Sequence, residues 1–115
     1  MISNITGGEN DTVDYKNKIF RMLYKEIFAA GKRKLLLNLF ENYDTKNNGK
    51  ITPENLESCL KQATGGSQSR FSDENIRKFV RQLHKDDQNK IPYIEFMDRT
   101  CALGNSNHNP LKSII

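Results

Sequence analysis

The fold is decided by one polar stretch, DTKNNGKITPEN, at residues 44–55. Its first part is rich in turn-forming residues, and Gly49 permits a backbone conformation that other residues disfavour. A single apolar residue, Ile51, is followed by Thr52 and Pro53, which suit the N-cap and the first position of a helix. The stretch therefore predicts a polar loop that leads directly into a helix.

Apolar residues at helical spacing flank this loop on both sides. One helix is predicted over about residues 32–43, and another is predicted to begin at Pro53. The residues predicted to share the inner faces are Leu36, Leu39, Phe40 and Tyr43 before the loop and Leu56, Cys59 and Leu60 after it.

The same order of features occurs a second time, with Ile91 in the place of Ile51, forty residues further on. Ser72 caps a predicted helix, a polar stretch over residues 84–90 follows, and a further helix carries Phe96. Residues 64–69, between the two repeats, are rich in Gly and Ser and predict a flexible linker. Helix, polar loop, single isoleucine and helix therefore form an internal repeat.

This repeat resembles the EF-hand pair of calmodulin-like proteins. The resemblance implies an all-α fold with hands at about 33–63 and 73–102, in which Ile51 and Ile91 pair in a short β-bridge. An extra N-terminal helix precedes the pair. The EF-hand domain is predicted to span residues 13–103, between a flexible lead-in at 1–12 and an irregular tail at 104–115.

In the first loop, the resemblance implies where calcium ligands would stand. Two residues depart from the family pattern: Lys46 stands where Asp or Asn is wanted, and Asn55 replaces a bidentate Glu. A protonated lysine offers no lone pair and repels a cation. The candidate ligands are Asp44, Asn48, Thr52 and Asn55, with the backbone carbonyl of Lys50.

In the second loop, His84 to Glu95, the pattern is also incomplete. The imidazole of His84 suits softer metals than calcium, and Pro92 supplies no side-chain oxygen. Asn89 takes the place of the turn glycine, a substitution that the left-handed conformation tolerates. The candidate ligands are Asp86, Gln88 and Glu95.

Calcium is the cofactor that the resemblance implies, but the loops predict weak binding or none. Calcium affinity depends on the number of charged ligands and on the rigidity of the site. Both loops lack about half of the anionic oxygens that the family pattern provides. The prediction is an EF-hand scaffold held by its core and by the Ile51–Ile91 pair rather than by metal.

Composition and charge exclude several functional classes. The chain has 115 residues with 18 Lys and Arg and 14 Asp and Glu, a formal net charge of +4. No apolar run approaches a membrane span, and no basic cluster is interleaved with aromatic residues as in a nucleic-acid surface. No catalytic motif is present, so we expect no enzyme. Cys59 and Cys101 form no disulfide framework, which is typical of a cytoplasmic protein.

The predicted N-terminal helix, about residues 14–29, carries an unusually broad apolar band. Two interpretations stay open. The helix packs into the groove of the EF-hand pair as a target helix does in calmodulin-like proteins, or it docks on another protein. The band consists of Ile19, Phe20, Met22, Leu23, Tyr24, Ile27 and Phe28.

The first functional hypothesis is a calcium-independent adaptor that binds a partner protein, through an amphipathic helix or an acidic polymer surface. The basic balance supports this hypothesis, because calcium sensors and buffers of this family are usually acidic. The acidic tubulin tails of microtubules are one such surface, which points to a cytoskeletal or axonemal protein in the cytoplasm or a cilium.

Two alternatives remain at this stage. One is a calcium sensor whose two half-sites cooperate and whose helices open when calcium binds. The other is the regulatory segment of a larger enzyme such as a calcium-dependent kinase, since the mostly apolar ending LKSII at residues 111–115 would suit a helix that continues in a longer polypeptide.

Overall fold

The computed structural model describes residues 15–105. The predicted lead-in at 1–12 and residues 106–115 of the predicted tail lie outside this range. The described chain is mostly helical, with one two-stranded sheet. Its elements are an N-terminal helix (15–23) that continues as the π-helix η1 (Tyr24–Phe28), α2 (Arg33–Tyr43), β1 (Lys50–Ile51), α3 (Pro53–Ala63), the 3₁₀-helix η2 (Gly66–Gln68), α4 (Asp73–Arg81), β2 (Ile91–Pro92) and α5 (Tyr93–Asn105).

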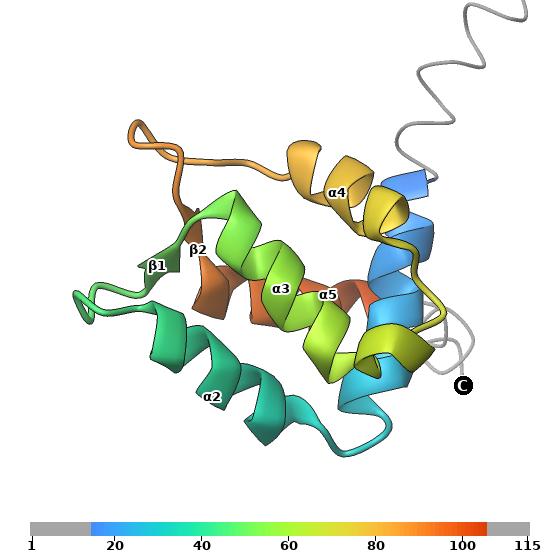
Figure 1. Cartoon of the computed structure of the whole chain (residues 1–115). Helices are drawn as coiled ribbons and strands as arrows, with labels where there is room; N and C mark the ends of the chain where they lie inside the picture. The colour runs from blue at the N-terminus through green and yellow to red at the C-terminus, as the bar shows by residue number, and fades with distance from the viewer. Residues whose placement is uncertain (1–14, 106–115) are drawn as a thin grey trace, which may run out of the picture.

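The predicted bridge between the two loops is confirmed. β1 and β2 lie side by side (Figure 1). They pair antiparallel, with Ile51 opposite Ile91 and Lys50 opposite Pro92. Both isoleucine side chains are buried and belong to the hydrophobic core. The fold class predicted from the repeat, an EF-hand pair preceded by a helix, is therefore correct.

The helix starts that the sequence predicts are also found. The hydroxyl of Thr52 accepts a hydrogen bond from the Asn55 N–H at 3.1 Å, and the hydroxyl of Ser72 accepts one from the Asn75 N–H at 3.0 Å. Each bond satisfies an amide that the first turn of a helix leaves without a backbone partner. In the two loops, Gly49 and its counterpart Asn89 both adopt positive φ angles, of 79° and 60°.

Aromatic side chains join the helices in the core. The ring of Phe96 in α5 lies 5.8 Å from that of Phe20, 6.2 Å from that of Phe79 and 6.2 Å from that of Phe40. Phe20 and Phe79 meet edge to face at 5.0 Å, a geometry that aromatic pairs favour. One ring thus connects the N-terminal helix, α2 and α4.

The N-terminal helix packs on the EF-hand pair, which decides between the two interpretations of its apolar band. Its buried residues Ile19, Phe20, Leu23 and Ile27 belong to the same core as the two hands. The start of this helix lies beside α4 (Figure 1). There the Tyr15 hydroxyl donates to the Asn75 carbonyl at 3.0 Å. None of the described helices is both long enough and apolar enough to cross a membrane.

Three local features differ from the prediction. Tyr43, predicted to face inward, is 37% exposed, because α2 directs Leu36 and Phe40 into the core. The linker contains η2, and the Thr64 hydroxyl, which donates to the Leu60 carbonyl at 2.8 Å, lies 2.6 Å from the Ser69 hydroxyl. α5 continues through residues 104 and 105, two positions beyond the predicted end of the domain.

Gly104 explains why α5 does not end where the glycine stands. A Cβ atom at this position would overlap the Tyr24 side chain, so the two helices approach too closely for any other residue. The glycine therefore serves helix packing, and its helix-terminating tendency is overridden.

We expect Gly104→Ala to destabilise the protein by about 1–3 kcal/mol, because the added methyl group overpacks the contact with Tyr24. In a Tyr24→Ala background the same substitution should stabilise the helix by about 0.5–1 kcal/mol, since alanine is the better helix former. Urea unfolding of the four proteins measures both effects. A loss of stability of equal size in both backgrounds would contradict the assigned contact.

Candidate functional site

The β1–β2 bridge brings the two polar loops, residues 44–55 and 84–95, next to each other. The five candidate ligands of the first loop line one cavity of about 150 Å³. Three lysines line the same cavity: Lys46, Lys50 and Lys90. The loop that would hold a cation in the family is thus lined by three lysine residues as well as by the candidate ligands.

The carboxylate of Asp44 is buried and accepts hydrogen bonds from three groups of the protein. Its Oδ1 accepts from the Asn48 N–H at 3.0 Å, and its Oδ2 accepts from the Gly49 N–H at 2.8 Å. The hydroxyl of Tyr93, at the start of α5, donates to the same Oδ2 at 2.7 Å. A residue of the second hand therefore donates a hydrogen bond to the acidic residue of the first loop.

These bonds change the pKa of both partners. The Tyr93 hydroxyl, followed by backbone N–H groups of the loop, lowers the pKa of Asp44 below its usual value, although burial opposes this effect. Burial, and then the hydrogen bond to Asp44, raises the pKa of Tyr93 to about 12. At neutral pH the pair consists of a charged carboxylate and a neutral phenol.

Other oxygens of the first loop are also engaged within the protein. The Asn48 Oδ1 accepts from the Lys50 N–H at 3.1 Å, and the Thr52 hydroxyl serves as the cap of α3. Asn55 contributes its backbone N–H to that cap. The loop is thus closed by its own hydrogen bonds.

In the second loop, Asp86 is held by a cation from the first loop. Its Oδ2 lies 2.9 Å from the Lys50 Nζ, and its Oδ1 accepts from the N–H groups of Gln88 at 2.9 Å and Lys90 at 2.8 Å. The Lys90 N–H, and next the Lys50 ammonium, lower the pKa of Asp86. A lysine side chain therefore stands where a metal ion would neutralise this carboxylate.

The remaining candidates of the second loop do not join Asp86 as a cluster. The Gln88 side chain is exposed, and Glu95 is an exposed residue that lines a separate small hollow with His84. Within residues 15–105, no three His, Cys, Asp or Glu side chains are grouped so that they could hold a metal ion.

A second lysine, Lys85, binds backbone carbonyls at the start of this loop. The Lys85 Nζ donates to the carbonyls of Val80, Arg81 and Leu83 at 2.9, 3.1 and 2.8 Å. The Val80 and Arg81 carbonyls lie at the C-terminal end of α4, where a positive charge is favoured, and the Leu83 carbonyl follows two residues after the helix. Burial lowers the pKa of Lys85.

The sequence pattern does not predict the roles of Tyr93 and of the Lys50 ammonium. The family pattern predicts only a backbone carbonyl ligand at Lys50. Its position opposite Pro92 in the bridge, however, places Lys50 beside the second loop. Tyr93 directly follows the bridge. The register of the Ile51–Ile91 pair therefore indicates that both Lys50 and Tyr93 lie next to the opposite loop.

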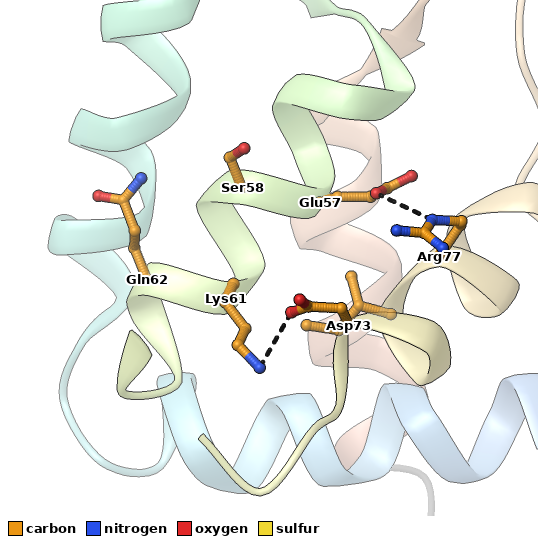
Figure 2. Close-up of a pocket in the computed structure, with 7 residues that line it drawn as sticks. Glu57, Ser58, Lys61, Gln62, Asp73 and Arg77 are labelled. Carbon is orange, nitrogen blue, oxygen red and sulfur yellow. Dashed lines mark ion pairs between the residues drawn. The ribbon is translucent and has the colours of Figure 1, made fainter. Parts of the chain in front are cut away.

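The hollow between α3 and α4 is a site of internal ion pairing (Figure 2). Lys61 lies 3.1 Å from Asp73, and the Arg77 Nε lies 3.9 Å from Glu57. Lys61 also donates to the Phe71 carbonyl at 2.7 Å. These pairs connect the last helix of the first hand to the first helix of the second.

The sequence comparison agrees with this geometry. The family model of the EF-hand domain pair matches residues 33–101. The chain therefore belongs to the EF-hand domain-pair family, and the match includes the first hand, the connecting linker and the second hand up to residue 101 of α5. No curated protein and no solved structure matches the chain.

Tyr93→Phe removes the hydroxyl that holds Asp44, and we expect a lower urea midpoint at pH 7. Because the folded-state pKa of Asp44 lies below its usual value, this carboxylate stabilises the fold above about pH 4. That contribution is lost as the pH falls through the folded-state pKa, so the difference between variant and wild type should shrink at acidic pH. Tyr43→Phe, at an exposed ring, is the control, and an equal effect of both substitutions would contradict the assignment.

Lys50→Met removes the ammonium but keeps an unbranched side chain. We expect the pKa of Asp86 to rise toward its usual value without reaching it, because the Lys90 N–H has the larger effect and remains. NMR titration of the carboxyl carbon measures this shift. Lys46→Met, at an exposed lysine of the same loop, should leave the Asp86 pKa unchanged; an unaltered pKa in Lys50→Met would refute the role of the ion pair.

Proposed function

We propose that this protein is a non-enzymatic EF-hand adaptor that binds a partner protein and works without calcium. The observation that carries the proposal is the Lys50–Asp86 ion pair, in which an ammonium of the first loop neutralises the main carboxylate of the second. The β1–β2 bridge brings the loops that carry these two groups next to each other. The link between the hands is thus made by the chain itself.

The loop residues do not fit a calcium ion. Calcium takes six to eight oxygen ligands, and tight sites supply several carboxylates. Here Asp44 and Asp86 already accept hydrogen bonds from N–H, O–H or ammonium groups. A calcium ion at Asp86 would have to compete with the Lys50 ammonium, and a calcium ion in the first cavity would be repelled by the positive charge of the three lysines that line it. The calcium cofactor implied by the family is therefore not part of the proposed function.

The helix packing supports the same proposal. An EF-hand sensor responds to calcium by opening its helix pairs and exposing an apolar groove. In this protein Phe20 of the N-terminal helix lies against Phe79 and Phe96, so an apolar segment of the chain already covers these residues. Partner binding would then use the outside of the molecule.

The charge of the protein favours an acidic partner. Residues 15–34 contain seven Lys and Arg residues and a single acidic residue, Glu26. A partner with an acidic surface, such as a microtubule or an acidic amphipathic helix, would complement this segment. A cytoskeletal or ciliary location in the cytoplasm remains part of this proposal.

Isothermal titration calorimetry with calcium tests the proposal. We expect no saturable heat from the wild-type protein up to about 1 mM calcium, whereas sensor loops bind at about 0.1–10 μM. As a matched control, Lys46→Asp with Asn55→Glu restores two ligand positions of the family pattern, and we expect it to bind about tenfold or more tightly than wild type.

Micromolar binding by the wild-type protein would overturn the proposal in favour of a calcium sensor. Glu95→Gln would then show whether the second loop holds the ion, because this change removes the carboxylate at the last position of that loop. Circular dichroism of every variant verifies that the helical fold is retained.

A further inference from the structure

We propose that the outer face of the N-terminal helix forms, with the end of α5, a docking groove for an acidic polypeptide segment that also carries apolar side chains. This inference rests on the proposed adaptor function and assigns it a surface. The groove has a volume of about 470 Å³. We call it the outer groove; it is lined by Lys18, Arg21, Met22, Tyr24, Lys25 and Gly104.

The spacing of the lining residues places them on one side of the helix. Residues 18, 21, 22 and 25 follow the i, i+3, i+4, i+7 pattern of a single helix face. The buried residues Ile19, Leu23 and Ile27 face the core. The helix therefore buries one face in the core, and the neighbouring face lines the outer groove. Met22 lies at the boundary, because it lines the groove and also packs against the core.

The apolar part of the outer groove is held by a close contact between helices. Tyr24 lies directly against Gly104 of α5, where no Cβ atom would fit. Its ring is stacked on that of Phe28, with 6.0 Å between ring centroids and an angle of 7° between planes. Together with the half-buried Met22, this arrangement gives the groove an apolar part.

The cationic part of the outer groove is not neutralised by the described chain. Lys18, Arg21 and Lys25 form no ion pair within residues 15–105. The acidic residue of this segment, Glu26, instead lies 3.8 Å from Arg70. Three cations beside apolar side chains are complementary to a segment that combines Asp or Glu with Leu or a similar residue.

Other occupants match the outer groove less well. Residues 106–115, SNHNPLKSII, contain no acidic residue and one lysine, so their charge does not complement the three cations. A nucleic acid would contact the cations through its phosphates but would leave the surface of Met22 without an apolar partner. An acidic polypeptide satisfies both parts of the groove.

Fluorescence anisotropy of a labelled peptide of Glu-Glu-Leu repeats tests the proposal on the full chain. We expect K18E/R21E/K25E to weaken binding about tenfold or more, since three favourable charge contacts become repulsive. The control K34E/K46E/R81E changes the net charge equally at exposed residues outside the groove and should alter binding by less than about threefold. Should the first variant not fold, K18Q/R21Q/K25Q replaces it.

Comparison of probes identifies the source of binding. A peptide of Glu alone should bind more weakly than the Glu-Glu-Leu peptide, because it lacks the apolar contacts. Equal binding of the two peptides, equal weakening by both triple variants, or tighter binding of poly-dT or of phosphatidylserine vesicles would each overturn the proposed occupant.

The same measurements separate this proposal from the proposed function. All titrations are run with calcium and with a calcium chelator. Peptide binding that requires calcium would defeat the calcium-independent adaptor itself. Calcium-independent peptide binding that survives K18E/R21E/K25E would defeat only the outer groove as its location.

Discussion

The pairing of β1 with β2 is the constraint on which the rest of the structure depends. Its register places Ile51 against Ile91 and, by the same geometry, sets Lys50 and Tyr93 at the boundary between the loops. Lys50 then reaches Asp86 of the second loop, and Tyr93 reaches Asp44 of the first. Each loop thus supplies the partner for the other loop's acidic residue. This exchange connects the two loops through side chains of the protein itself.

The same exchange connects the loops to the core. Tyr93 packs against Phe40 with 5.2 Å between their centroids, and Phe40 in turn contacts Phe96. The ring of Phe96 also meets Phe20 of the N-terminal helix. A continuous series of side chains therefore runs from the Asp44 carboxylate to the helix that covers the two hands. Opening of the helices would separate these rings and expose apolar surface, a cost that no bound metal ion offsets in the proposed function.

The sequence predicted the fold well because its signals are local and repeated. Each of these signals acts on the backbone next to it. The capping residues Thr52 and Ser72 start their helices, the residues at 49 and 89 form the loop turns, and the two isoleucines mark the bridge. The contacts of the candidate site are different, because they join residues far apart in the chain. The hydrogen bond from Tyr93 to Asp44 spans 49 positions, and only the register of the bridge reveals it. The exposure of Tyr43 was mispredicted because only part of the predicted apolar face of α2 contacts the core. Leu36 and Phe40 are buried, whereas Tyr43 lies at the edge of that face.

The N-terminal helix shows how such a protein could acquire a binding surface without calcium. In a sensor, the apolar groove is created by opening the EF-hand pair, so binding and conformational change are coupled. Here the inner face of the helix, with Phe20, is part of the core, and the outer face carries Lys18, Arg21 and Lys25. A partner on the outer face requires no opening, because the surface is already formed. The proposed surface is therefore always available, and its affinity depends on ionic strength rather than on calcium, since contacts between exposed charges are screened by salt.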